Sequence, residues 1–183
     1  MQIHGCLNGE EARKYIEVAE SRGFTHQGSR GPKYGEAFRN HYRYSTQDEG
    51  ICKQLWEATG LCHAVKGLLD SDQDPLGLNP NIRIYKYGPG DRFGTHVDDS
   101  QYVDDMQGWT RYTLLVYLSD TQGGETVFYN DRGRLVARIA PRTGLAVFHK
   151  HGDECLEHEA MPVVQGIKYV LRSDVVFSSS SSL

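Results

Sequence analysis

The stretch RFGTHVDDS, residues 92–100, places a histidine and a carboxylate two positions apart, at His96 and Asp98. Side chains two positions apart on a β-strand point to the same side, so these two can converge on one metal ion. The same spacing also occurs on polar surface strands, and it leaves both interpretations open. A third ligand would have to come from a distant segment, and three histidines near the C-terminal end are candidates: His149, His151 and His158.

Of the three candidates, His158 is the predicted ligand, because Lys168 follows it on the next expected strand and brings a cation near the metal. His149 and His151 form a second His-x-His pair that a surface loop explains equally well. Two neutral imidazoles and one carboxylate leave about three adjacent coordination positions open, as in non-haem Fe(II) oxygenases. A structural zinc site would instead be closed by protein ligands.

The cysteines do not indicate a zinc site or a disulfide framework. Cys6, Cys52, Cys62 and Cys155 are scattered without a C-x-x-C pair, and reduced, mostly structural thiols are the expectation. The chain has 183 residues and a formal net charge of -4, which gives no overall attraction to nucleic acid or to an anionic membrane. No apolar run is long enough for a membrane span or a signal peptide, so we expect an intracellular protein, cytoplasmic or nuclear.

The metal-binding residues need strands to position them, and the sequence changes character near residue 80. Helical spacing over 8–24, with Asn8 and Glu11 at its start, and over 48–61 predicts two helices. Between them, 25–45 has no clean period and is expected to be a long loop. After residue 80 come about eight short β-type segments separated by turn formers, within 81–87, 92–98, 110–119, 125–130, 134–140, 144–150, 155–160 and 168–177.

This pattern predicts a mainly β jelly-roll or related barrel with N-terminal helices packed on it. We expect a single domain over 1–177, with a helical lead-in over about 1–80 and the jelly-roll core over about 81–177. The serine-rich segment 178–183 is too polar to pack and is expected to be a disordered tail.

The chain resembles the 2-oxoglutarate- and Fe(II)-dependent dioxygenases, and within them the prolyl 4-hydroxylase-like branch. Four segments between about 81 and 177 carry the resemblance: YKYGPGDRFGTHVD, RYTLLVYLSDTQGGETVF, APRTGLAVFH and HEAMPVVQGIKYVLRSDVVF. The family pattern is His-x-Asp, a distal histidine and a lysine ten residues later, matched here by His96, Asp98, His158 and Lys168. The resemblance implies a double-stranded β-helix and a requirement for Fe(II), 2-oxoglutarate and O2.

The resemblance also implies roles for individual residues. Lys168 would pair with the distal carboxylate of 2-oxoglutarate, and Tyr87, nine residues before His96, matches a family tyrosine that reaches this cosubstrate. Thr113 and Tyr117 share one face of their expected strand and would point inward beside Lys168, although packed strand residues explain both equally well. In many prolyl 4-hydroxylases a tryptophan stands six residues after the lysine, where this chain has Asp174.

The implied activity is hydroxylation of a substrate C–H bond with release of succinate and CO2. A peptidyl proline or another protein side chain is the first expectation, while a small molecule or a modified nucleotide stays open. Nucleic acid is disfavoured because the chain is acidic and uses a lysine where the familiar demethylases use arginines. A catalytically silent β-barrel binding module is the alternative from another class. The basic and aromatic segment within 27–45 is either a substrate clamp, with a possible role as a lid, or a solvated connector.

Overall fold

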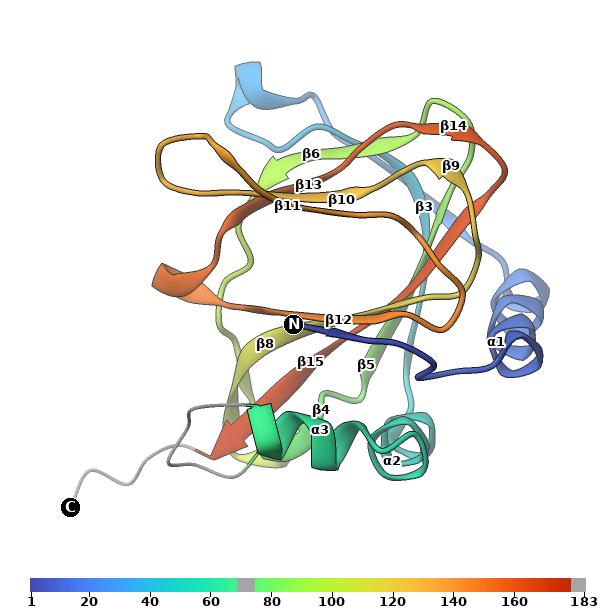
Figure 1. Ribbon diagram of the computed structural model, residues 1–183, viewed down its shortest axis with the longest axis vertical. Helices are drawn as coiled ribbons and strands as arrows, with labels where there is room; N and C mark the ends of the chain where they lie inside the picture. The colour runs from blue at the N-terminus through green and yellow to red at the C-terminus, as the bar shows by residue number, and fades with distance from the viewer. Residues whose placement is uncertain (69–74, 179–183) are drawn as a thin grey trace.

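The computed structural model describes residues 1–68 and 75–178, and Figure 1 shows its three helices beside a strongly curled sheet. The helices are α1 (Gly9–Arg22), α2 (Glu49–Ala58) and α3 (Leu61–Leu68). A capping box starts α1, because Asn8 Oδ1 accepts from the Glu10 and Glu11 amides while the Glu11 carboxylate accepts from the Asn8 amide. Helices α1 and α2 confirm the two predicted helices. The third helix was not predicted. It begins directly after Gly60, which has a positive φ and breaks the helical path of the chain between α2 and α3.

The strands of the described residues follow the predicted segments closely after residue 80. In chain order they are β1 (Gln2–Ile3), β2 (Thr25–Gly28), β3 (Arg39–Gln47), β4 (Pro75–Leu78), β5 (Asn81–Tyr87), β6 (Arg92–His96), β7 (Tyr102–Val103), β8 (Gly108–Tyr117), β9 (Gln122–Gly123), β10 (Thr126–Tyr129), β11 (Leu135–Ile139), β12 (Ala146–Lys150), β13 (Glu157–Ala160), β14 (Val163–Gln165) and β15 (Lys168–Ser178). Short 3-10 helices follow at η1 (Pro32–Tyr34), η2 (Asp104–Met106) and η3 (Gly152–Glu154).

Thirteen of the described strands form one antiparallel sheet that folds back on itself. Its main path runs β1-β12-β8-β15-β5-β3-β6-β13-β10-β11, and β9 pairs separately with β14. Figure 1 shows the two halves facing each other: β12, β8, β15 and β5 below, and β6, β13, β10 and β11 above. This is the predicted jelly-roll, two sheets with a core between them. The prediction of one domain over 1–177 stays a prediction, and the predicted disordered tail lies outside the described residues except for Ser178.

The expectation of a long loop over 25–45 is wrong. This segment forms the hairpin of β2 and β3, and β3 bonds to both β5 and β6, so that it joins the two halves of the sheet. Along β3 only His41 is buried. The strand therefore lacks the apolar alternation from which a strand is recognised in sequence, because its inward position holds a histidine.

The alternation of β15 connects the core to the site. Tyr169 and Leu171 pack into the cluster that holds α1, α2 and α3 against the outer face of the sheet. The intervening positions Lys168, Val170 and Arg172 face the other way, into the space between the two sheets. This strand is bonded along both edges, to β8 and β5. Two basic side chains are thus carried into the interior by the most fully paired strand of the sheet.

No helix of the described residues is long and apolar enough to cross a membrane. All four cysteines are free, as expected.

Candidate active site

The three predicted metal ligands come together where β6 ends beside β13. His96 is the last residue of β6 and stands opposite His158 in the register of these strands. Asp98 follows on the segment after β6, and one ligand atom from each of the three lies within 4.8 Å of the others. His151, a candidate that was not chosen, is outside this set. The structure thus brings together residues that lie as far as 62 positions apart in sequence.

Backbone carbonyls fix the orientation of the two histidine rings. His96 Nδ1 lies 2.9 Å from the Gly94 carbonyl oxygen, and His158 Nδ1 lies 3.0 Å from that of Leu156. Since a carbonyl can only accept, each Nδ1 carries the proton and each Nε2 keeps a free lone pair. Burial lowers the pKa of His158 and, with His158 nearby, lowers that of His96 to about 4. Both rings are therefore neutral near pH 7, the form that binds a metal.

Asp98 stands at the centre of a dense polar network. Its Oδ1 lies 3.1 Å from Arg172 Nη1, and its Oδ2 accepts a 2.7 Å hydrogen bond from the Thr113 hydroxyl. Burial would raise the pKa of the Asp98 carboxyl, but the Arg172 guanidinium, together with nearby imidazoles and Thr113, holds it well below its usual range. The carboxylate is therefore charged near neutral pH.

A second carboxylate extends this network away from the ligands. Asp174 accepts from Arg172 at 3.4 Å and from Arg83 at 3.0 Å. Two buried carboxylates, Asp98 and Asp174, are thus matched by two guanidinium groups. Such pairing is what buried charges require, because an unpaired charge in the interior is very costly. His151 is held beside them between the hydroxyls of Thr110 and Thr113, at 3.1 and 2.7 Å.

The expectation that the HKHGD segment is a surface loop is wrong. His149 lies on β12 and has a side chain that is only 8% exposed, while that of His151 is 1% exposed. The His149 ring packs against the His158 ring with centroids 4.4 Å apart. Its Nε2 has no hydrogen-bond partner among the described residues and lies 3.6 Å from Asp98 Oδ2. The alternation of β12 carries His149 inward, and His151, directly after the strand, is buried as well, although neither is apolar.

Lys168 occupies a different environment from Asp98. It is 2% exposed, and its ammonium donates a 2.7 Å hydrogen bond to the Gly124 carbonyl. The ring centroids of Tyr87 and Tyr117 lie 5.0 and 5.6 Å from Nζ. Burial lowers the pKa of Lys168 to about 7, partly offset by Glu125. Within the described part of the chain, Gly124 supplies its one hydrogen-bond acceptor, so two of its three N–H donors are available to a ligand.

Gly124 itself can be at this position only because it lacks a side chain. Its φ of +72° is unfavourable for other residues, and a Cβ would lie 3.0 Å from Val163 Cγ2 and 3.2 Å from Lys168 Cδ. Gly123 has the same φ and faces the Pro162 carbonyl, 2.7 Å from where its Cβ would be. The two glycines therefore serve backbone geometry.

The expected cosubstrate residues lie at unequal distances from Lys168. Tyr87 is its direct partner in the register of β15 and β5, and Tyr117 turns its hydroxyl to Thr126 at 2.6 Å. Thr113 does not lie beside Lys168, contrary to expectation, and contacts Asp98 instead. It shares a face with Tyr117, but four strand residues span about 13 Å. Thr113 therefore lies farther along β8 from Lys168 than Tyr117 does.

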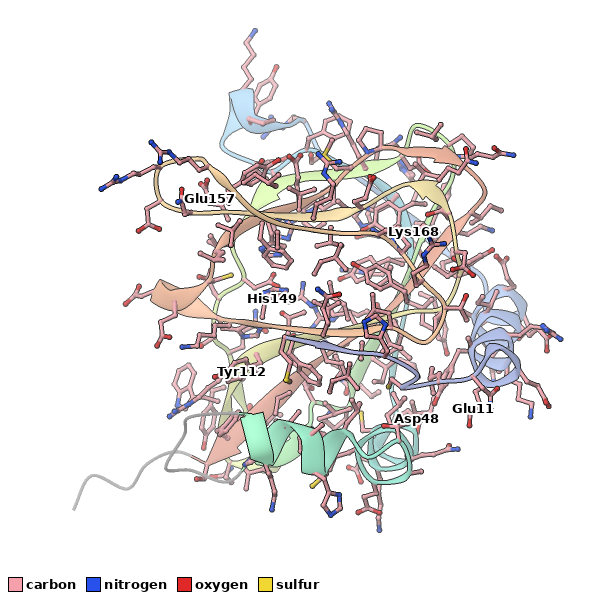
Figure 2. All side chains as sticks on the ribbon, in the orientation of Figure 1. Glu11, Asp48, Tyr112, His149, Glu157 and Lys168 are labelled. Carbon is pink, nitrogen blue, oxygen red and sulfur yellow. The ribbon has the colours of Figure 1, made fainter. Side chains whose placement is uncertain are left out.

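Both ends line one pocket of the structure. Figure 2 labels His149 and Lys168, which lie between the two sheets. The lining residues are Tyr85, Tyr87, Phe93, His96, Asp98, Leu115, Thr126, His149, His158, Glu159, Ala160, Lys168, Val170 and Arg172. Sequence reasoning weighed His149 only as an alternative third ligand and did not single out Thr126 or Arg172. Their inward positions on β12, β10 and β15 were the available signal.

The comparisons with known proteins agree with this geometry. Residues 82–173 match the model of the 2OG-Fe(II) oxygenase superfamily. The protein belongs to this superfamily. No curated protein sequence matches the chain. Because it belongs to this superfamily, the oxygenase depends on Fe(II), 2-oxoglutarate and O2, as predicted.

Solved structures of prolyl hydroxylases share the fold of this oxygenase. The viral collagen prolyl hydroxylase of Paramecium bursaria Chlorella virus-1, in its 2-oxoglutarate complex, aligns with a TM-score of 0.68 and 22% identity over 98% of this chain and 96% of its own. A Pseudomonas putida prolyl-4-hydroxylase gives 0.66 and 16%, over 96% and 91%. A Trichoplax adhaerens prolyl hydroxylase, in complex with a hypoxia inducible factor peptide fragment, gives 0.69 and 16%, over 96% and 82%. At these identities the likeness establishes the double-stranded β-helix.

The residues present fit the groups that the superfamily requires. Two neutral imidazoles with free Nε2 lone pairs and one ionised carboxylate are suitable donors for Fe(II). A buried ammonium with unused donors is suitable for one carboxylate of 2-oxoglutarate. The assignment of His96, Asp98, His158 and Lys168 to these tasks is a prediction from the sequence that the geometry supports.

Proposed function

We propose that this oxygenase hydroxylates a side chain of a peptide or protein substrate, with a prolyl residue as the first candidate. In this proposal His96, Asp98 and His158 hold Fe(II), and Lys168 holds the distal carboxylate of 2-oxoglutarate. One observation carries it: the three ligands and the buried ammonium line the same pocket, at its two ends. A dianionic cosubstrate that bridges a metal and a cation needs this arrangement.

With iron and 2-oxoglutarate bound, the site supplies the oxidation of 2-oxoglutarate by O2 to succinate and CO2, coupled to hydroxylation of a substrate C–H bond. The chain's own residues prepare this chemistry. Arg172 and Thr113 hold the Asp98 carboxylate in one orientation. The Gly94 and Leu156 carbonyls hold the two imidazoles. The preorganised ligands therefore spend little free energy on reorganisation when the metal binds.

At the other end, Lys168 would form a charge-assisted hydrogen bond with the cosubstrate carboxylate. Tyr87 lines the pocket beside it, and the Tyr117 ring lies near the ammonium while its hydroxyl is held by Thr126. Apolar side chains such as Val170 and Leu115 complete the walls. They exclude water, which strengthens the attraction between the two charges.

A peptide substrate is favoured by the surface next to His96. The Phe93 ring stacks on the His96 ring with centroids 3.8 Å apart, and the Arg39 guanidinium lies 5.0 Å from the Phe93 centroid. Close by, Arg92 lies 4.5 Å from the ring of Phe38. Basic groups on aromatic faces, adjoining a metal ligand, suit an extended chain with acidic residues. The Trichoplax adhaerens neighbour, which was solved with a peptide fragment, supports the same choice.

The test is anaerobic loading with ferrous iron, followed by 2-oxoglutarate, air and a panel of proline-containing peptides of differing charge. Succinate release together with the gain of one oxygen atom by a peptide is the expected result. Oxygen gain confined to free amino acids, other small molecules or modified nucleosides would replace the peptide substrate. Absence of succinate from folded, iron-loaded protein would overturn the proposal and favour a silent binding module.

Substrate approach over Arg39 is checked with a matched pair of variants. Arg39→Ala should raise KM for acidic peptides without changing the affinity for 2-oxoglutarate. Arg134→Ala removes an exposed arginine from the turn between β10 and β11 and should have no effect. Equal KM values for Arg39→Ala and the unsubstituted protein would place substrate elsewhere.

A further inference from the structure

A second group of metal-binding side chains overlaps the first. One ligand atom from each of His149, Cys155 and His158 lies within 4.8 Å of the others, the same spread as in the His96, Asp98 and His158 set. The two sets share His158. The His149 ring lies 4.4 Å from the His158 ring, and the His96 ring lies 4.2 Å from it. His158 therefore has a potential partner ligand on two sides.

The state of His149 points to a ligand. Its side chain is more than nine-tenths buried, and within the described chain Nε2 makes no hydrogen bond. An unsatisfied buried ring nitrogen costs free energy that a metal bond would recover. His149 is not a member of the His96, Asp98 and His158 set, so binding of iron to that set gives its ring nitrogen no bond.

Cys155 provides the second new ligand. It follows η3, its thiol is free, and its sulfur accepts a 3.2 Å hydrogen bond from the Asp98 amide. This contact holds the sulfur against the segment that carries the iron ligands. One thiolate and two imidazoles suit zinc, whereas two imidazoles and one carboxylate suit ferrous iron.

We propose that His149, Cys155 and His158 form a second metal site, selective for zinc, which competes with iron through the shared His158. When zinc binds, the Cys155 thiol releases its proton to solvent, and the three side chains close around the ion. Zinc ligands stand roughly 3.3–3.8 Å apart at normal bond lengths, so from a spread of at most 4.8 Å the set contracts by no more than about 1.5 Å. Because one Nε2 lone pair binds one ion, zinc in this set leaves His96 and Asp98 with an incomplete iron site.

This inference rests on the proposed iron ligands only through His158, and its test has a readout other than activity. Cobalt(II) replaces zinc and reports a bound thiolate by a near-ultraviolet sulfur-to-cobalt charge-transfer band. The protein is titrated anaerobically with cobalt(II) alone. We expect the band in the unsubstituted protein and in His96→Ala, which keeps the second set intact. We expect its loss in Cys155→Ala and its persistence in Cys62→Ala, the matched removal of a partly buried thiol outside the site.

The outcomes separate the two sites. Cobalt that binds with no thiolate band in the folded protein, or a band that survives Cys155→Ala, overturns the zinc site and leaves the iron site standing. A thiolate band in a protein that forms no ferrous 2-oxoglutarate complex overturns the iron assignment instead.

A second measurement keeps the inference testable where Cys155→Ala folds poorly. X-ray absorption of the zinc-loaded unsubstituted protein should show one sulfur and at least two nitrogen ligands, and purely nitrogen and oxygen ligation contradicts the proposal. Competition titrations with Cys155→Ser should show zinc affinity lowered by more than about 100-fold, since loss of even an outer-shell partner costs 10–100-fold. Ferrous affinity should fall by less than about tenfold. Equal losses for both metals would also contradict it.

Discussion

The two ends of the pocket use charge in opposite ways. At the metal end, Asp98 and Asp174 are matched by Arg172 and Arg83, so the network is balanced before any ligand arrives. At the other end, the Lys168 ammonium is buried with one carbonyl and two aromatic rings. Ligands that are already paired fix geometry, whereas an unpaired cation provides affinity for an anion. Positioning and attraction are thus assigned to separate residues, Arg172 and Lys168, which stand four positions apart on the same face of β15.

The largest expected effect breaks the metal end alone. His96→Ala should abolish turnover and lower ferrous affinity by more than about 100-fold, because a direct ligand is lost. The His96 ring hydrogen-bonds only to the Gly94 carbonyl among the described residues, so the thermal unfolding midpoint should change little. Anaerobic titration followed by the visible charge-transfer band of the ferrous 2-oxoglutarate chelate measures this. His63→Ala, an exposed histidine of α3, is the control, and a normal band in His96→Ala would refute the assignment.

Breaking the other end should have a double result. Lys168→Met should weaken 2-oxoglutarate binding by about 100-fold, since loss of a buried charge partner costs about 2–5 kcal/mol. It should also raise the free energy of unfolding of the ligand-free protein by about 1–3 kcal/mol, because an unpaired ammonium leaves the interior. Calorimetric binding and chemical denaturation measure the two effects, with Lys53→Met on the exposed face of α2 as control. A destabilised Lys168→Met protein would mean that the ammonium is already well paired.

A milder change tests whether the two ends are independent. Thr113→Val keeps the shape of the side chain and removes the hydroxyl that bonds Asp98 and His151. Ferrous affinity should fall by about tenfold, as for other partners of metal ligands, while 2-oxoglutarate affinity at saturating iron should hardly change. Equilibrium titrations of each ligand decide this. A fall in cosubstrate affinity as large as that in iron affinity would return Thr113 to the role first expected from the sequence.

The smallest effect is a pH dependence that belongs to one end. Burial lowers the pKa of Lys168 to about 7, and Glu125 offsets part of this shift. Tyr87 and Tyr117 are the other titratable groups around the ammonium. A bound carboxylate favours the protonated form. The complex then holds more protons than the free protein above about pH 7. The dissociation constant of 2-oxoglutarate should rise with pH there, by at most about tenfold per unit. Lys168→Arg, which stays charged, should remove this slope, and an unchanged slope would assign it to another group.

The sequence predicted most of the fold beyond residue 80, because there turn formers separate short β-type segments. It did not predict β3, where the buried position is His41, or α3, which follows α2 after only Thr59 and Gly60. The candidate ligands His96, Asp98 and His158 were identified from spacing and resemblance. Their surroundings were not, because Arg172, Thr113 and His149 reach Asp98 only through the pairing of β15, β8 and β12, which no local pattern encodes.

The placement of Lys168 on β15 has a consequence for how the molecule fluctuates. That strand is bonded on both sides and packs against the helices, so its amides should exchange with deuterium only through global unfolding. Asp98 follows the last residue of the short strand β6, whose pairing with β13 is irregular, and amides there should exchange through local opening. The proposed anion-binding cation therefore has the permanence of the whole fold, while the proposed ligand Asp98 belongs to a segment that can open and close many times before the protein unfolds once.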